Sequence, residues 1–310
     1  MYATNHKIIG ASFCHRHLIN QKSLITDALN AYASLGLKNI RLGCYWSEIE
    51  KTAGQYDFEV IDKLVNKCRK LGIQIVMTVG MKAPRYPEYY IPDWVIDKTD
   101  INRLSFTYQN DFFSKILFSF VKQVIAHFKD NDSIVFWQIE NEPLDPSGPR
   151  WWRIDYGFLE KETELVRRTD PSRPIVINLW GNKLQKRNYY PQVMQLADIV
   201  GFDLYPKVPC ENKHGKVSFQ GIDDSDSTIK AIIKQIKAAN KKVWISELQA
   251  EPWIYPESCL PQDVIKNSEW VEDWDIDGIF YWGYEYWYKQ KKLGNTAYWE
   301  AAQRAIKLYI

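Results

Sequence analysis

The stretch Ile134–Pro143 (IVFWQIENEP) decides the fold that this sequence predicts. Its apolar first half is typical of a buried β-strand, and the proline ends the strand because it has no N–H for the hydrogen-bond ladder. Glu142 stands directly before that proline. Parallel α/β barrels carry their chemistry on residues at the carboxyl ends of such strands. The stretch therefore predicts a strand and a candidate catalytic carboxylate together.

The same pattern recurs in Val243–Glu247 (VWISE), a second short apolar run that closes on a glutamate. Hydrolysis of a glycosidic bond needs two carboxyl groups, because one protonates the leaving oxygen and the other attacks the sugar. We therefore interpret Glu142 and Glu247 as a candidate catalytic pair. The neighbouring Asn141 is a candidate donor to the sugar 2-hydroxyl, and Glu140 is expected to have a structural hydrogen-bonding role.

Strand and helix patterns alternate along the whole chain. The predicted strands are Ile8–Phe13, Lys38–Leu42, Ile73–Val79, the stretch Ile134–Pro143, Pro174–Leu179, Ile199–Asp203, Lys242–Ser246 and Gly278–Trp282. The helical patterns include Ser23–Leu35, Phe58–Cys68, Phe113–Phe128, Trp151–Arg168, Tyr190–Ala197, a helix capped by Ser227, Pro261–Asp273 and Asn295–Tyr309. Near-continuous apolar strands between amphipathic helices indicate a parallel sheet.

Eight such units predict an α/β fold, a closed (β/α)8 or TIM barrel that spans residues 1–310 as a single catalytic domain. An open doubly wound sheet that binds a nucleotide is the alternative, but no glycine-rich phosphate loop follows the first strand. Two connections are long. Gly80–Tyr108 is rich in proline and aromatic residues and is expected to wall a cleft, and Lys207–Asp224 is polar and expected to be mobile.

The composition excludes several classes of partner. The chain has 310 residues, 45% of them hydrophobic, and a net charge of +2 without a long basic run, so nucleic acid is not an expected partner. No segment approaches the roughly 18 apolar residues of a membrane span. Aromatic residues make up 15% of the chain, which suits a sugar-binding cleft.

The five cysteines are scattered and lack C-x-x-C spacing, so we expect free thiols in a reducing compartment and no metal site. Met1–Lys7 has no apolar signal region. The predicted location is the cytoplasm, or outside the cell if the sequence is already processed. Oligomeric state does not follow from the sequence.

The stretch Trp137–Pro143 (WQIENEP) resembles the acid/base motif of glycoside hydrolase clan A, whose members are retaining (β/α)8 enzymes. Its Asn-Glu-Pro ending is similar to the family 5 cellulases, and its QIENE part is similar to the family 35 and 42 β-galactosidases. Further matches to the galactosidases are Arg41–Glu50 (RLGCYWSEIE), continuing through Gly54–Phe58, and Asp203–Pro206 (DLYP).

This resemblance implies Glu142 as acid/base and Glu247 as nucleophile. It places Arg41 and Tyr205 near the nucleophile, Asn141 on the 2-hydroxyl and Trp282 under the sugar, and Trp46 lies in a matched motif as a further substrate-binding candidate. Family 5 enzymes usually have histidines at two strand ends where this sequence has Gly80–Lys82 and Asp203–Tyr205.

The predicted function is a retaining β-glycosidase that acts on β-linked glycosides through a glycosyl-enzyme intermediate, with a carbohydrate substrate and no metal or organic cofactor. A barrel that binds glycans without cleaving them is the alternative. The sugar, the linkage and internal versus terminal cleavage are left open, as are the roles of His15 and His17.

Overall fold

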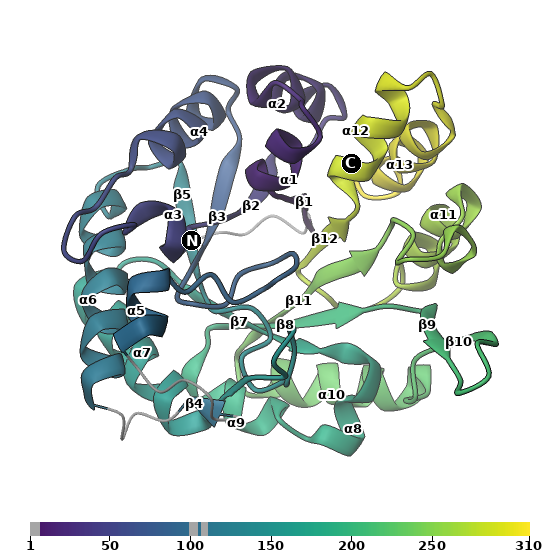
Figure 1. The fold of residues 1–310 in the computed structure, drawn as a ribbon. Coiled ribbons are helices and arrows are strands. Elements are labelled where there is room, and N and C mark those ends of the chain that lie inside the picture. The colour runs from purple at the N-terminus through teal and green to yellow at the C-terminus, as the bar shows by residue number, and fades with distance from the viewer. Residues whose placement is uncertain (1–6, 99–104, 107–110) are drawn as a thin grey trace. The chain divides into compact units, whose positions relative to one another are not determined.

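The computed structural model describes residues 7–98, 105–106 and 111–310, and its main strands form a closed barrel (Figure 1). Eight parallel strands follow one another around it in the order β1, β12, β11, β8, β7, β5, β3 and β2. The predicted (β/α)8 barrel is confirmed, and the open sheet is excluded because the order closes on itself. The strands are β1 Ile8–Phe13, β2 Asn39–Gly43, β3 Gln74–Val79, β5 Ile134–Ile139, β7 Ile175–Trp180, β8 Ile199–Leu204, β11 Lys242–Gln249 and β12 Gly278–Trp282.

Helices separate these strands along the chain. In the first half they are α1 His15–Asn20, α2 Ile25–Ser34, α3 Trp46–Ile49, α4 Glu59–Lys70, α5 Asp93–Lys98, α6 Asp111–Phe128 and α7 Tyr156–Thr169. In the second half they are α8 Leu184–Arg187, α9 Tyr190–Leu196, α10 Asp226–Ala238, α11 Pro261–Trp270, α12 Tyr284–Lys292 and α13 Ala297–Lys307, with 3-10 turns η1 Gly181–Lys183 and η2 Pro256–Ser258.

The starts of α7 and α10 differ from the predicted ones because different side chains cap them. Helix α7 begins at Tyr156 instead of Trp151, since the Asp155 carboxylate accepts the N–H of Phe158 at 2.8 Å. Helix α10 is capped by Ser225 instead of Ser227, and Ser225 Oγ accepts the N–H of Thr228.

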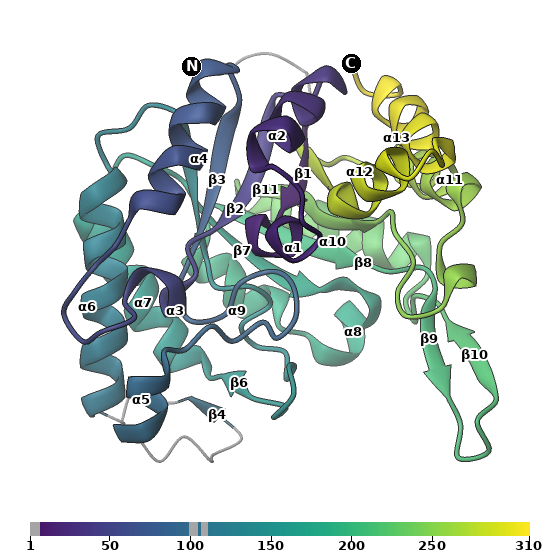
Figure 2. The same ribbon diagram turned by 45° about the horizontal axis from the view of Figure 1, so that its top comes forward.

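The two long connections contain more regular structure than the sequence suggests. Within 207–224, β9 Val208–Glu211 and β10 Val217–Gln220 form an antiparallel hairpin, which extends away from β8 (Figure 2). The expectation of a loop without regular structure is therefore wrong for this segment, and its mobility stays a prediction. The connection that begins at Gly80 contains α5 and the short strand β4 Ser105–Phe106, which pairs with β6 Arg153–Ile154; its predicted end at Tyr108 lies outside the described residues.

The chain divides into two compact units. The first comprises Met1–Ile40, Trp180–Asn188 and Gly201–Ile310, and the second comprises Arg41–Leu179 and Tyr189–Val200. Strands of both units belong to the barrel, and the prediction that the whole chain is a single domain stays a prediction.

Each unit has an aromatic core of its own. In the first, the rings of Phe13 and Tyr284 stack with centroids 5.6 Å apart. In the second, Trp46 stacks on Phe120 at 5.5 Å, and Figure 1 shows α4 and α6 on the outer side of β3 and β5. No helix in the described parts of the chain is long and apolar enough to cross a membrane.

Candidate active site

Glu142 lies on a tight turn that follows β5. The strand ends at Ile139, and the backbone then enters the left-handed region twice, with φ of +57° at Glu140 and +44° at Glu142. Such conformations cost about 1–3 kcal/mol each for residues other than glycine, so they persist only where the surroundings impose them. Here the Glu142 N–H donates to Asn178 Oδ1 at 2.9 Å, and the Glu142 carbonyl accepts from Lys82 Nζ at 2.7 Å.

Asn141 is oriented by two donors. Its side-chain oxygen accepts from Arg41 at 2.5 Å and from Asn178 Nδ2 at 2.9 Å, while Arg41 Nε donates to Gln138 at 2.6 Å. Arg41 and Asn141 are 2% and 4% exposed. The structure thus brings two of the predicted site residues together, and it fixes the amide of Asn141 with its oxygen toward Arg41.

Glu140 has the structural role that the sequence predicted. Its carboxylate accepts the backbone N–H groups of Met81, at 3.0 Å, and of Lys82, which ties the segment after β3 to the turn after β5. Gly80 makes this approach possible, because a Cβ at that position would lie 2.2 Å from the Glu140 carboxyl carbon.

A second buried acid, Glu162 of α7, lies close enough to Glu140 for their charges to interact. Burial raises the pKa of Glu140 to about 7, opposed by its backbone hydrogen bonds. Burial, and then the charge of Glu140, raises the pKa of Glu162 well above its ordinary value. The pair therefore keeps a proton in the folded protein near neutral pH.

Substitution of Glu162 by glutamine is expected to stabilise the protein at pH 8. Between pH 4.5 and 7 the unfolded chain releases protons that the folded pair still holds, so the free energy of unfolding falls as the pH rises. A neutral glutamine removes one of these acids and should raise this energy at pH 8 by about 1–3 kcal/mol, with little effect at pH 4. Thermal unfolding at both pH values measures the difference.

Glu164→Gln is the matched control, because Glu164 is exposed on the same helix and pairs with Lys161 at the surface. Its melting temperature should follow the wild type at both pH values. A Glu162→Gln variant that is equally destabilised at pH 4 and pH 8 would show that the charge of Glu162 does not oppose folding.

Glu247 lies within β11 and not beyond its end, because the strand runs three residues further than predicted. The register passes from Ile245 opposite Ile279 to Leu248 opposite Tyr281, so Ser246 and Glu247 stand opposite a single residue of β12. This is a β-bulge, a feature that redirects a side chain at the end of a strand. The hydroxyl of Ser246 donates to Asp203 of β8 at 2.5 Å, which helps to hold the bulge.

Tyr205 contacts Glu247 directly. Its hydroxyl donates to Glu247 Oε2, and its own backbone is held on both sides by Asn182, through N–H to Oδ1 at 2.9 Å and Nδ2 to C=O at 2.7 Å. The side chains of Tyr205 and Glu247 are 6% and 2% exposed. The Glu247 carboxylate of β11 thus has a fixed hydrogen-bond donor in Tyr205, the residue that follows β8.

Removal of the Tyr205 hydroxyl by substitution with phenylalanine is expected to lower kcat/KM for a cleaved glycoside by roughly 10- to 100-fold. A hydrogen bond to a charged group contributes about 1.5–3 kcal/mol, and each ~1.4 kcal/mol corresponds to a factor of ten. Tyr255→Phe is the control, since Tyr255 donates to the surface carboxylate of Glu211. Equal activity of Tyr205→Phe and the wild type would contradict a role for this bond.

Two aromatic residues that the sequence patterns did not indicate lie around Tyr205. Trp180, the last residue of β7, stacks on Tyr205 with centroids 5.1 Å apart, and Trp253 lies 5.3 Å from the same ring. Trp253 is 41% exposed. A tryptophan at a strand end is a signal for Trp180, whereas nothing in the sequence brings Trp253 to this cluster.

The remaining predicted residues are placed differently. Trp46 is fully buried, packs on α6 and donates its indole N–H to Glu50 at 2.7 Å, so its position does not support the predicted substrate contact. Trp282 ends β12 and is partly exposed. Of the two histidines in α1, His15 is buried and His17 is exposed.

Among the described residues, no group of three or more His, Cys, Asp or Glu side chains could hold a metal ion. All five cysteines are free thiols, and four of them are buried. The expectation that no cofactor is needed stays a prediction.

The chain is similar in sequence to known β-galactosidases. Beta-galactosidase LacA of Lactobacillus acidophilus is 30% identical over 105 residues, which are 31% of this chain and 16% of that protein. Beta-galactosidase BbgII of Bifidobacterium bifidum is 23% identical over 127 residues, 37% of this chain and 18% of that protein. The chain therefore spans less than a fifth of either relative.

Two solved structures share the fold. The polyextremophilic β-galactosidase from the Antarctic haloarchaeon Halorubrum lacusprofundi has a TM-score of 0.67 at 15% identity, covering 97% of this chain and 58% of its own. The endo-β-1,4-mannanase from Thermotoga petrophila has a TM-score of 0.63 at 15% identity, covering 90% of this chain and 68% of its own. The model of the cellulase family, glycosyl hydrolase family 5, matches residues 2–290. With its closed (β/α)8 barrel, this chain therefore belongs to the cellulase family of clan A glycoside hydrolases.

Proposed function

We propose that this chain hydrolyses β-linked glycosides with retention of configuration. The observation that carries the proposal is that hydrogen bonds hold each of its two glutamates in place. Glu142 stands on a turn held by Asn178 and Lys82 after β5, and Glu247 stands on a bulge of β11 with the Tyr205 hydroxyl on its carboxylate. A parallel barrel carries its chemistry at the carboxyl ends of its strands. Glu142 follows the end of β5, and Glu247 is among the last three residues of β11.

In the proposed mechanism, Glu142 gives its proton to the glycosidic oxygen while the Glu247 carboxylate attacks the anomeric carbon. The bond to the leaving oxygen breaks, and an ester between sugar and Glu247 forms. Glu142 then takes a proton from water, whose oxygen attacks the same carbon and releases Glu247. Two inversions give overall retention, which requires carboxyl groups roughly 5–5.5 Å apart.

Two further residues, Asn141 and Trp282, are proposed to bind the sugar. Because the Asn141 oxygen accepts from Arg41 and Asn178, the Asn141 Nδ2 group is the one that would donate to the 2-hydroxyl. Trp282 offers a partly exposed indole at the end of β12 on which a pyranose ring would stack. Arg41 holds Asn141, and its predicted influence on Glu247 stays a prediction.

The substrates are proposed to be β-linked hexosides, because the relatives include β-galactosidases and an endo-β-1,4-mannanase. The free cysteines support the predicted cytoplasmic location, where thiols stay reduced.

The test is hydrolysis of aryl β-galactosides, β-mannosides and β-glucosides, and of β-1,4-linked galactan, mannan and cellulose oligosaccharides, followed by NMR of the first anomeric product. Release of a β-anomer that later mutarotates supports retention. An α-anomer would overturn the double displacement. Binding of an oligosaccharide without any turnover on the whole panel would favour the non-catalytic alternative.

A further inference from the structure

Lys82 is a lysine in an unusual place. It follows the end of β3, a place in which family 5 enzymes usually have a histidine. Its side chain is fully buried. Its backbone N–H donates to the Glu140 carboxylate, which fixes where the side chain starts. A buried ammonium group is costly unless it is paired and hydrogen-bonded, so such a residue needs a reason that packing alone does not supply.

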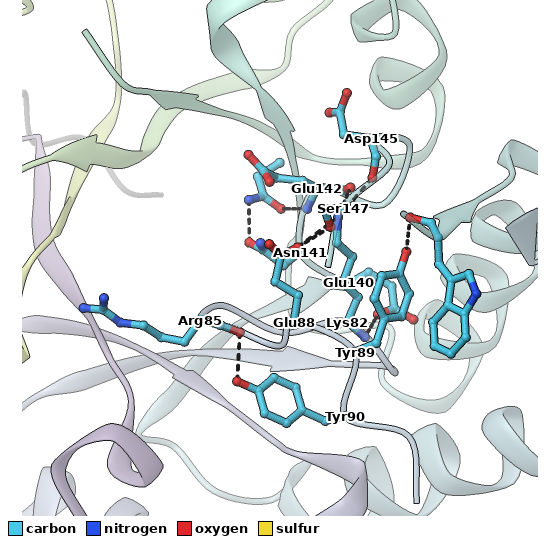
Figure 3. A network of polar contacts seen from close by, with 12 residues as sticks. Lys82, Arg85, Glu88, Tyr89, Tyr90, Glu140, Asn141, Glu142, Asp145 and Ser147 are labelled. Atoms are coloured by element: carbon cyan, nitrogen blue, oxygen red, sulfur yellow. Dashed lines mark hydrogen bonds and ion pairs between the residues drawn. The ribbon is translucent and has the colours of Figure 1, made fainter. Parts of the chain in front are cut away.

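The ammonium group points to the turn that carries Glu142 (Figure 3). Lys82 Nζ donates to the carbonyl of Glu142 at 2.7 Å and to the carbonyl of Asp145 at 3.2 Å. The Glu88 carboxylate lies 3.6 Å away and balances its charge. Glu88 also accepts from the Ser147 hydroxyl, so the segment after β3 is bonded to both ends of the turn.

These bonds act on the backbone that aims the Glu142 side chain. With its φ of +44°, Glu142 stays in a conformation that the turn must impose. Asn178 holds the N–H of Glu142 and Lys82 holds its carbonyl, so both peptide groups that flank the Cα are fixed. Loss of either bond would let the residue relax and move its carboxyl group away from the glycosidic oxygen.

We propose that Lys82 is a positioning residue for Glu142, which holds the proton donor in line with the leaving oxygen. The inference rests on the proposed function of Glu142 as acid/base. It assigns Lys82 to proton transfer, because its ammonium group donates to the carbonyls of Glu142 and Asp145 and pairs with Glu88.

The experiment compares wild type and Lys82→Met on phenyl and 2,4-dinitrophenyl β-glycosides of the sugar that the wild type cleaves. Departure of dinitrophenolate needs no proton, whereas departure of a phenol does. The expected loss in kcat/KM is on the order of 10- to 100-fold for the phenyl glycoside, as for a misplaced catalytic group. The loss for the dinitrophenyl glycoside is expected to stay below about threefold.

Lys63→Met is the matched control, because Lys63 is exposed on α4 and pairs with Glu59 at the surface. Should Lys82→Met fail to fold, Glu88→Gln answers the same question, since Glu88 is partly exposed and the substitution removes the charge that holds the ammonium group. Its expected loss is about three- to tenfold, again confined to the phenyl glycoside.

Equal losses on both glycosides, or no loss on either, would overturn the role of Lys82 in proton transfer while leaving the proposed function intact. A wild type that cleaves neither these glycosides nor any other substrate of the panel would overturn the proposed function, and this inference with it.

Discussion

Replacement of Glu247 by glycine is expected to lower kcat/KM by a factor on the order of 10⁵ or more, the largest effect of any single substitution in this chain. Without the carboxylate no ester to the sugar can form, and the hydroxyl of Tyr205 loses its acceptor. The fold should survive, because β11 pairs with β12 through backbone groups on either side of the bulge.

A small anion should then take the place of the missing carboxylate. Azide entering the space of the Glu247 side chain would attack the anomeric carbon from the face opposite the leaving group. The expected product is an α-glycosyl azide, formed from a dinitrophenyl β-glycoside and identified by NMR. This product is specific for loss of the nucleophile, because azide that replaces an acid/base instead traps the ester and gives the β-azide.

Glu257→Gln serves as the control, since Glu257 is an exposed glutamate in η2, the short turn that follows β11 in the sequence. Glu251 is a second buried carboxylate nearby in the sequence, two residues after the end of β11, and it is 8% exposed. If Glu247→Gly kept its activity and Glu251→Gly gave the α-azide, the nucleophile would be Glu251 and our assignment would be wrong.

The sequence predicted the barrel well because its strands are short apolar runs with clear ends. The bounds of β1 and β12 agree with the prediction, and those of β2, β3, β7 and β8 differ by one residue at one or both ends. Strand β5 ends at Ile139 instead of Pro143, because the backbone turns at Glu140. Strand β11 runs on to Gln249 instead of Ser246, because the backbone still pairs where Ser246, Glu247 and Gln249 interrupt the apolar pattern. A bulge of this kind depends on the neighbouring strands, which a single sequence does not display.

The residues around the two candidate glutamates were harder to predict than the glutamates themselves. A lysine just beyond an apolar strand is usually at the surface, so the sequence around Lys82 did not indicate that its side chain is buried. The 208–220 hairpin lacks a buried face, and its polar residues resemble a loop. Trp46 was predicted to bind sugar. Glu50 lies four residues further along the chain, a spacing at which two side chains of one helix can contact each other, and it accepts the hydrogen bond of the Trp46 indole.

Replacement of Glu142 by alanine is expected to give losses that depend on the leaving group. General acid catalysis contributes about 10²- to 10⁴-fold, so phenyl and oligosaccharide substrates should lose activity on that scale. A dinitrophenyl glycoside should still form the ester on Glu247 at nearly the wild-type rate. Hydrolysis of that ester then lacks its base, and a burst of dinitrophenol followed by slow turnover is expected in a stopped-flow trace.

Azide should accelerate the slow phase of Glu142→Ala and yield a β-glycosyl azide, because it attacks the ester from the face that Glu142 occupied. The Glu142→Ala and Glu247→Gly variants therefore give opposite anomers from one substrate, and each anomer identifies one role. Glu164→Gln, an exposed change in the same unit, should show neither burst nor azide product. An α-azide from Glu142→Ala would exchange the two roles, and a loss of equal size on every leaving group would remove Glu142 from proton transfer.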